Sequence, residues 1–232
     1  MVKRNRLWFN SFKFWLLKIV NTQLFNGSID DVRVYNRGSL GGGGEKPLQT
    51  RDAYARKYRK PGKNASLQKG LVGYWSFNSP DMAENISYDR SGQGNNGTLT
   101  SGSSIIEGKL GQALSFDGND DVVQVTRNTG LEPATITVAD WIKASSFSGT
   151  SVNEIIGKQA NGTAGTGLGE GNSSYNPYTN SSGIAKFTLY DGSSETTIRS
   201  PTLSVNTWYN PHSNGRGLWL IGRVISHIRR AG

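Results

Sequence analysis

Apolar and polar residues alternate with a period of two along several short stretches of the chain. In residues 71–78 every second position, from Leu71 to Phe77, shares one face, and this spacing predicts a β-strand rather than a helix. Leu114 with Phe116, and Val123 with Val125, repeat the pattern on either side of the loop 117–120. A Gly-containing loop between two alternating segments predicts a β-hairpin. Antiparallel strands at this spacing favour a β-sandwich.

Further strands are predicted from the same alternation and from runs of β-formers. Strands are expected at 29–36, 134–143, 154–159 and 185–190, whereas 161–182 is rich in Gly, Asn and Ser and is expected to be loop with at most a short strand. A short helix is predicted at 48–58, before Pro61 and Gly62. In residues 1–23 basic residues interrupt apolar positions at helical spacing, so this flank is too charged and too short to cross a bilayer.

Three segments in the middle of the chain carry a family resemblance. GLVGYWSFN from Gly70, DRSGQGNNGTL from Asp89 and GKLGQALSFDGNDDVVQV from Gly108 together resemble the opening of a laminin G-like jelly-roll domain, of the concanavalin A-like lectin superfamily. FNGSIDDVRVYNR from Phe25 resembles the last strand of the same family. The resemblance implies an all-β fold, a concanavalin A-like jelly-roll sandwich that is incomplete because no closing strands follow Tyr209, with a basic, partly helical or disordered N-terminal flank.

The resemblance divides the chain into five parts. These are an unmatched basic flank (1–23), the terminal strand of a laminin G-like domain (24–37), a linker (38–69), a truncated jelly-roll domain (70–209) and an unmatched tail (210–232). In the family the last strand lies beside the first, antiparallel to it. We therefore predict that residues 29–36 fill the vacant position beside residues 71–78 of the same chain, where they cover an otherwise bare sheet edge.

The charge distribution argues against a nucleic-acid partner. The net charge of +9 is the sum of +11 in residues 1–70, −6 in 71–209 and +4 in 210–232. The jelly-roll part is therefore acidic, whereas a nucleic-acid binder carries its basic patch on the folded reading surface. The chain has no Cys, so its stability does not depend on disulfides.

Catalytic motifs are scarce in the sequence. The two histidines, His212 and His227, stand in the unmatched tail, and no Cys nucleophile or Gly-x-Ser-x-Gly elbow is present. Asp120 and Asp121 are adjacent, and adjacent strand residues point to opposite faces, so they are not expected to form a glycosidase couple. No catalytic residue is predicted.

Calcium is the cofactor that the residues suggest, because Ca²⁺ prefers carboxylate, amide and carbonyl oxygens on bent loops. Laminin G-like relatives commonly carry a calcium at a loop edge, which adds to this expectation. The alternative is that these side chains only accept hydrogen bonds from their own turns. The candidate ligands lie in two loops: Asp89, Asn95 and Asn96 in one, and Asp117, Asn119 and Asp120 in the other.

Aromatic side chains in loops are candidates for stacking against sugar rings. Tyr175 and Tyr178, with Tyr190 nearby, are the predicted ligand-binding residues, whereas Trp75, Trp141 and Trp208 are assigned to the core because they lie in predicted strands. Asp140 stands where the family has a small core residue. A carboxylate in that position costs several kcal/mol unless it is paired or protonated.

The end of one laminin G-like domain standing before the start of another implies tandem modules. This arrangement, the resemblance and the acidic β domain favour a non-catalytic binding or adhesion module of a secreted or cell-surface protein. Its expected partner is a glycan or a cell-surface protein. Two alternatives remain: an accessory or catalytic part of a carbohydrate-active enzyme such as a glycoside hydrolase, and a structural spacer. An extracellular or cell-surface location is implied by the family alone.

Overall fold

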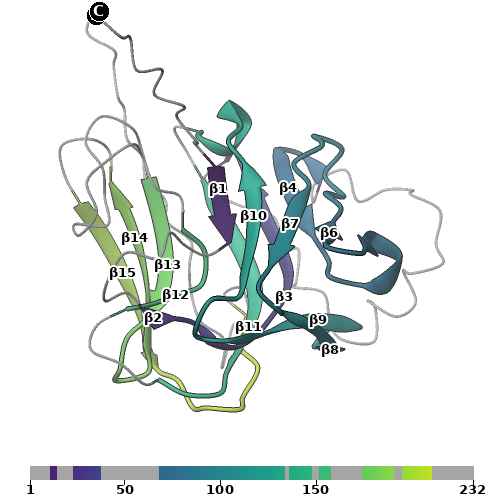
Figure 1. Ribbon diagram of the computed structural model, residues 1–232. Helices are drawn as coiled ribbons and strands as arrows, with labels where there is room; N and C mark the ends of the chain where they lie inside the picture. The colour runs from purple at the N-terminus through teal and green to yellow at the C-terminus, as the bar shows by residue number, and fades with distance from the viewer. Residues whose placement is uncertain are drawn as a thin grey trace, which may run out of the picture.

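The described residues fold into largely antiparallel β-sheets with almost no helix, as the computed structural model shows (Figure 1). The structure describes residues 11–14, 23–37, 68–133, 136–147, 152–157, 174–190 and 195–210. The predicted helix at 48–58, most of the flank and linker, and the tail beyond residue 210 lie outside the described residues. The prediction of an all-β protein is confirmed.

The strands form three five-stranded sheets. The first has the order β1 (Ser11–Phe14), β10 (Val122–Thr126), β7 (Gly97–Thr100), β6 (Ile86–Ser87) and β5 (Met82–Ala83). The second has the order β11 (Thr137–Ala144), β3 (Asn26–Tyr35), β9 (Gln112–Asp117) and β8 (Ser104–Glu107), with β4 (Leu71–Trp75) also paired to β3. The third has the order β15 (Glu195–Thr202), β14 (Ile184–Tyr190), β13 (Ser174–Thr179), β12 (Asn153–Glu154) and β2 (Gln23–Leu24). Two short 3-10 helices lie in connections between strands: η1 (Ser79–Asp81) between β4 and β5, and η2 (Thr129–Leu131) between β10 and β11.

Strand β3 is the centre of the second sheet. Its C-terminal half pairs antiparallel with β4, Val32 opposite Trp75 and Val34 opposite Gly73, so the predicted ladder between residues 29–36 and 71–78 is confirmed. Its N-terminal half pairs with β9, and its other edge pairs with β11 along almost its whole length. The sequence therefore predicted one neighbour of this strand correctly, but β3 has three.

One hydrophobic core joins the three sheets. Apolar residues of β3 and β4, above all Ile29, Val32, Val34 and Trp75, pack into it with at most 1% of their surface exposed. The first sheet adds valines from β10, and the third sheet adds aromatic and aliphatic residues from β13 and β14. These further contributors are Val123, Val125, Tyr175, Ala185 and Phe187. The period-two pattern of the sequence matches this burial along β10, where Val123 and Val125 are buried, but not along the whole of β3.

A bulge interrupts the pairing of β3 with β11. Asp30 lies opposite Trp141 and Arg33 opposite Ala139, so two residues of β3 face the single residue Asp140. Asp31, one of the two, has a left-handed backbone with φ of 53°, which Asp tolerates better than most residues. Because an extra residue shifts the alternation, β3 buries Ile29 before the bulge and Val32 after it.

Two carboxyl groups are buried at this bulge. Asp140 is 3% exposed and Asp30 is fully buried. Burial raises the pKa of each to about 7 from the ordinary 3.8. Asp30 Oδ2 accepts a hydrogen bond from the Leu110 N–H at 2.7 Å, but Asp30 Oδ1 and Asp140 Oδ2 have no hydrogen-bond partner within the described structure. The sequence left the direction of residue 140 open; the structure places its carboxyl group in the interior, where the raised pKa lets it stay protonated.

The predicted hairpin around residues 117–120 is wrong. Strand β9 belongs to the second sheet and β10 to the first, so the loop between them crosses from one sheet to the other. The reason is that β3, which is distant in sequence, takes the position beside β9 that a hairpin partner would occupy. Residues 161–182 were expected to contain at most one short strand, and within the described part of this range the structure has β13. Strand β14 confirms the strand predicted at 185–190.

Candidate functional site

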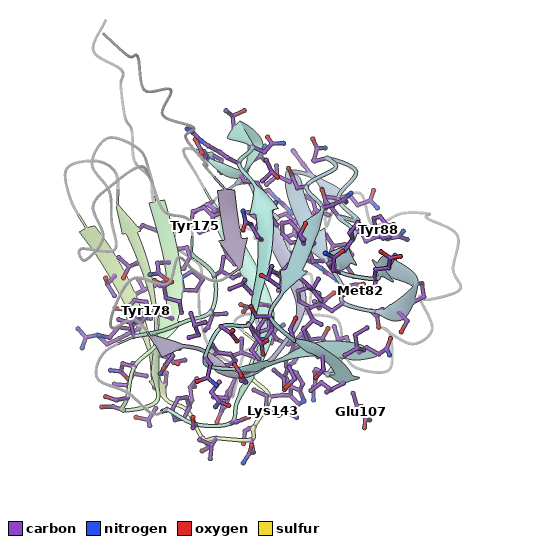
Figure 2. All side chains as sticks on the ribbon, viewed as in Figure 1. Met82, Tyr88, Glu107, Lys143, Tyr175 and Tyr178 are labelled. Carbon is purple, nitrogen blue, oxygen red and sulfur yellow. The ribbon has the colours of Figure 1, made fainter. Side chains whose placement is uncertain are left out.

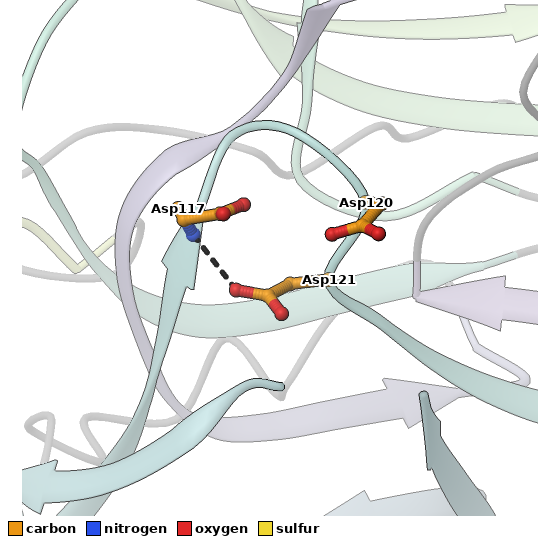
Figure 3. Close-up of side chains that lie close together, drawn as sticks. All are labelled: Asp117, Asp120 and Asp121. Carbon is orange, nitrogen blue, oxygen red and sulfur yellow. Dashed lines mark hydrogen bonds between the residues drawn. The ribbon is translucent and has the colours of Figure 1, made fainter. Parts of the chain in front are cut away.

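The loop that crosses between the sheets, residues 118–121, gathers three carboxylates. Asp117 ends β9, and Asp120 and Asp121 immediately precede β10. One oxygen from each of the three lies within 4.8 Å of the other two, and Figure 3 shows the three side chains converging on the inside of the loop. Gly118 makes the turn possible: its φ is +82°, and a Cβ there would lie 3.0 Å from the Asn26 Cβ.

Hydrogen bonds hold two of these carboxylates in place. Asp117 Oδ1 accepts the Asn119 N–H at 2.7 Å, and its Oδ2 accepts the Asn119 side-chain amide at 2.9 Å; these bonds lower the pKa of Asp117. Asp121 is 5% exposed, and its Oδ2 accepts the Asp117 N–H at 2.9 Å. Burial, followed by the charges of Asp117 and Asp120, raises the pKa of Asp121. The loop therefore concentrates negative charge at a point fixed by its own backbone.

The structure changes the membership of the predicted set. Asn119 serves as a hydrogen-bond donor to Asp117, whereas Asp121, which was not predicted as a ligand, joins Asp117 and Asp120. The argument that set Asp120 and Asp121 apart assumed that both lie on a strand, and this assumption is wrong because both lie in the loop. In a loop, neighbouring side chains can point to the same side, and sequence spacing alone does not reveal it.

The other predicted loop, 89–96, is closed by internal hydrogen bonds. Asp89 Oδ1 accepts the N–H groups of Tyr74 and Ser91 at 2.9 and 2.8 Å, and Oδ2 accepts the Ser91 hydroxyl and the Asn95 N–H at 2.7 and 2.9 Å. Four donors use the four acceptor positions of a carboxylate. Asn96 Oδ1 accepts the Asp89 N–H at 2.9 Å. This loop follows the alternative left open by the sequence, in which Asp and Asn residues organise a turn.

Asn95 has a structural position below the same loop. It is buried, its amide nitrogen donates to the Val72 carbonyl at 2.7 Å, and its side-chain oxygen accepts from the Asn128 amide at 2.8 Å. Its own carbonyl accepts the Trp75 indole N–H at 2.8 Å. These bonds tie the loop to β4 and to η2, and they leave Asn95 inside the fold.

The predicted sugar-stacking tyrosines lie in strands, and neither Tyr175 nor Tyr178 is an exposed loop residue. Tyr175 lies in β13, is 3% exposed and directs its hydroxyl to the Leu131 carbonyl at 3.4 Å, so it is a core residue (Figure 2). Burial raises the pKa of its phenol. Tyr178 is half-buried on β13, with the Lys186 Nζ 5.7 Å from its ring centroid. Tyr190 ends β14, and its side chain lies outside the described residues.

Two tryptophans occupy positions that the sequence did not predict. Trp75 is a core residue, as expected, but Trp141 and Trp208 are only half-buried. Lys109 Nζ lies 5.3 Å from the Trp141 ring centroid, and Lys143 Nζ lies 5.0 Å from that of Trp208. The half-exposure of Trp141 follows from strand alternation, since Trp141 and Lys143 point away from the core and Ile142 between them points into it; Trp208, predicted to lie in a strand, follows β15 in irregular structure.

Comparison of the chain with protein-family models, curated proteins and solved structures finds no match in any of the three. The fold class and the geometry of the loop therefore carry the functional argument. Within the described residues, no helix combines the length and the apolar character needed to cross a membrane.

Proposed function

We propose that this chain is a non-catalytic binding module that holds a calcium ion in the acidic loop 117–121. The observation that supports the proposal is the convergence of Asp117, Asp120 and Asp121, with one oxygen of each within 4.8 Å of the others. Three carboxylates this close repel one another, and a divalent cation among them removes the repulsion.

The choice of calcium rests on the kind of donor. All three side chains offer hard oxygen ligands, and the group contains no His or Cys of the kind that zinc prefers. A site with few protein ligands and several water positions binds weakly, in the range of about 10⁻⁴–10⁻³ M that is typical of extracellular calcium modules. This range agrees with the secreted or cell-surface location that the laminin G-like resemblance implies.

The partner is proposed to be a glycan or a cell-surface protein. Trp141 and Trp208, which are half-buried and each paired with a lysine, support this assignment better than the tyrosines, because partly exposed aromatic rings offer faces for contact. In this proposal the sandwich is a jelly roll of the concanavalin A-like kind. A glycan array shows whether sugars bind, and a hydrolysis assay on the glycans that bind distinguishes a binding module from a glycoside hydrolase.

Thermal unfolding with and without calcium tests the metal site. At a calcium concentration about tenfold above Kd, binding to the folded state alone adds about 1.4 kcal/mol to the free energy of unfolding. For a domain of this size the expected rise in Tm is a few degrees. EGTA should reverse the rise, and Mg²⁺, which demands a tighter octahedral shell, should produce a smaller one.

Two matched variants make this test specific. Asp120→Asn removes one ligand charge from an exposed side chain and should abolish most of the calcium-dependent rise. Glu107→Gln removes one charge from an exposed side chain of β8. Glu107 pairs with Gln112, at the other end of β9 from Asp117, so this variant should leave the rise intact. An unchanged Tm across EGTA and millimolar Ca²⁺ in the wild-type chain would refute the metal site.

A further inference from the structure

The N-terminal part of the chain contributes one strand to each of the three sheets. Strand β1 pairs with β10, β2 pairs with β12, and β3 pairs with β4, β9 and β11. We call β1, β2 and β3 together the arm, and the described residues from 68 to 210 the body. No sheet of the described structure is made by the body alone.

The contacts of β3 show how much of the fold depends on the arm. Phe25, Ile29, Val32, Val34 and Tyr35 are each at most 1% exposed, and their burial requires the body on both sides. Backbone hydrogen bonds connect β3 to β11 along one edge and to β9 and β4 along the other. Without the arm, the body would present an apolar trough between unpaired strand edges, and such edges accept a strand from another chain.

The segment that connects the arm to the body leaves β3 and enters β4 at neighbouring positions. Tyr35 lies opposite Leu71, and the Asn36 N–H donates to the Gly70 carbonyl at 2.8 Å. The intervening residues 37–69 have a contour length of about 110 Å when extended, at about 3.3 Å per residue. This length is ample for the arm of one copy to reach the body of another while every strand keeps its pairing.

We propose that the trough of the body accepts the arm of a second copy of this chain, so that two copies form an arm-exchanged dimer. Each body in the dimer makes the same ladders and the same core contacts as in the monomer, because only the origin of the arm differs. The equilibrium between monomer and exchanged dimer is set by the effective concentration of the arm for its own body. For a flexible connection of this kind that concentration is on the order of millimolar. The dimer therefore forms when chains fold together at high concentration.

Two serines allow this exchange to be recorded as a covalent bond. Ser28 of β3 and Ser115 of β9 are cross-strand partners, and the chain has no cysteine of its own. Cross-strand neighbours have the Cα separation that a disulfide needs, and Ser→Cys is almost isosteric. A ¹⁵N-labelled Ser28→Cys chain and an unlabelled Ser115→Cys chain are unfolded, mixed in equal amounts, refolded at a concentration of about 1 mM and oxidised.

The expected product is a disulfide between one labelled and one unlabelled chain, identified by mass and by peptide mapping to residues 28 and 115. Random choice of partner places this bond in about half of the exchanged dimers. The double variant Ser28→Cys/Ser115→Cys, refolded at low concentration, should close the same disulfide within one chain. A control for random collision replaces Ser115→Cys with Gln93→Cys, because Gln93 is exposed in the loop 89–96 and a thiol there is open to chance encounters.

Two results would overturn the proposal. One is an interchain disulfide that is no more frequent with Ser115→Cys than with Gln93→Cys. The other needs no cysteine: a wild-type chain refolded at the same concentration that remains wholly monomeric by light scattering. A dimer fraction that rises with the refolding concentration, together with the mapped 28–115 bond, supports the exchange.

Discussion

The buried carboxyl group of Asp140 should make the stability of this protein fall as the pH rises through neutrality. Asp140 lies inside the sandwich opposite the bulge of β3, 3% exposed, and burial raises its pKa to about 7 from 3.8. Between these two pH values the unfolded chain has released the proton, while the folded chain still holds it. The free energy of unfolding therefore decreases from about pH 4 to about pH 7 and is level above and below this window.

The size of the effect follows from the two pKa values. Their difference corresponds to about 4 kcal/mol as an upper value, with a slope of about 1.4 kcal/mol per pH unit inside the window. Asp30, which is also buried and has a pKa of about 7, contributes a second slope of the same sign. The slopes of the two groups add between about pH 4 and about pH 7.

Asp140→Asn is the decisive change, because it keeps the size of the side chain and removes its titration. The variant should lose about half of the slope, and it should gain more stability relative to wild type at pH 8, where Asp140 is ionised, than at pH 5. Adding Asp30→Asn should flatten the remaining slope. Urea unfolding followed by tryptophan fluorescence, to which the buried Trp75 contributes, measures these differences at pH 5, 6, 7 and 8. A slope in Asp140→Asn equal to that of wild type would refute the reasoning.

Two further predictions concern the parts of the fold that the arm and the 89–96 loop hold together. Ile29→Ala in β3 should lower the free energy of unfolding by about 2–5 kcal/mol, whereas Ile105→Ala, at a position 43% exposed, should change it by less than about 0.5 kcal/mol; equal losses in urea unfolding would contradict the central place of β3. Asn95→Ala should cost about 1–3 kcal/mol, because it leaves the Val72 carbonyl and the Asn128 amide without their partner. Asn128→Ser, which removes the bond to Asn95 but keeps a side-chain oxygen to cap η2 at the Gly130 N–H, should cost less, and the opposite order would show that the Val72 bond is unimportant.

The sequence alone predicted the positions of several strands, because their residues alternate between apolar and polar. Strands were predicted at 29–36, 71–78 and 185–190, and the structure has β3, β4 and β14 there, although β4 ends at Trp75 and the bulge shifts the alternation of β3. The pairing of β3 with β4 was also predictable, although only through the laminin G-like resemblance of the two segments. The same resemblance showed that Asp140 stands at a position that is usually a small core residue, but it did not decide whether the carboxyl group is buried; the structure decided it.

Tertiary structure alone decided what the loops and the intervening residues do. The loop 117–120 was predicted to close a hairpin, but β3 occupies the edge of β9, so the loop crosses between sheets and brings Asp121 to Asp117 and Asp120. Tyr175 is a core residue and Trp141 is not, because the side that a strand presents to the core depends on the sheets packed against it. Period two shows that a residue lies on one of two faces. Only the packing of distant segments determines which face is buried and which carboxylates meet.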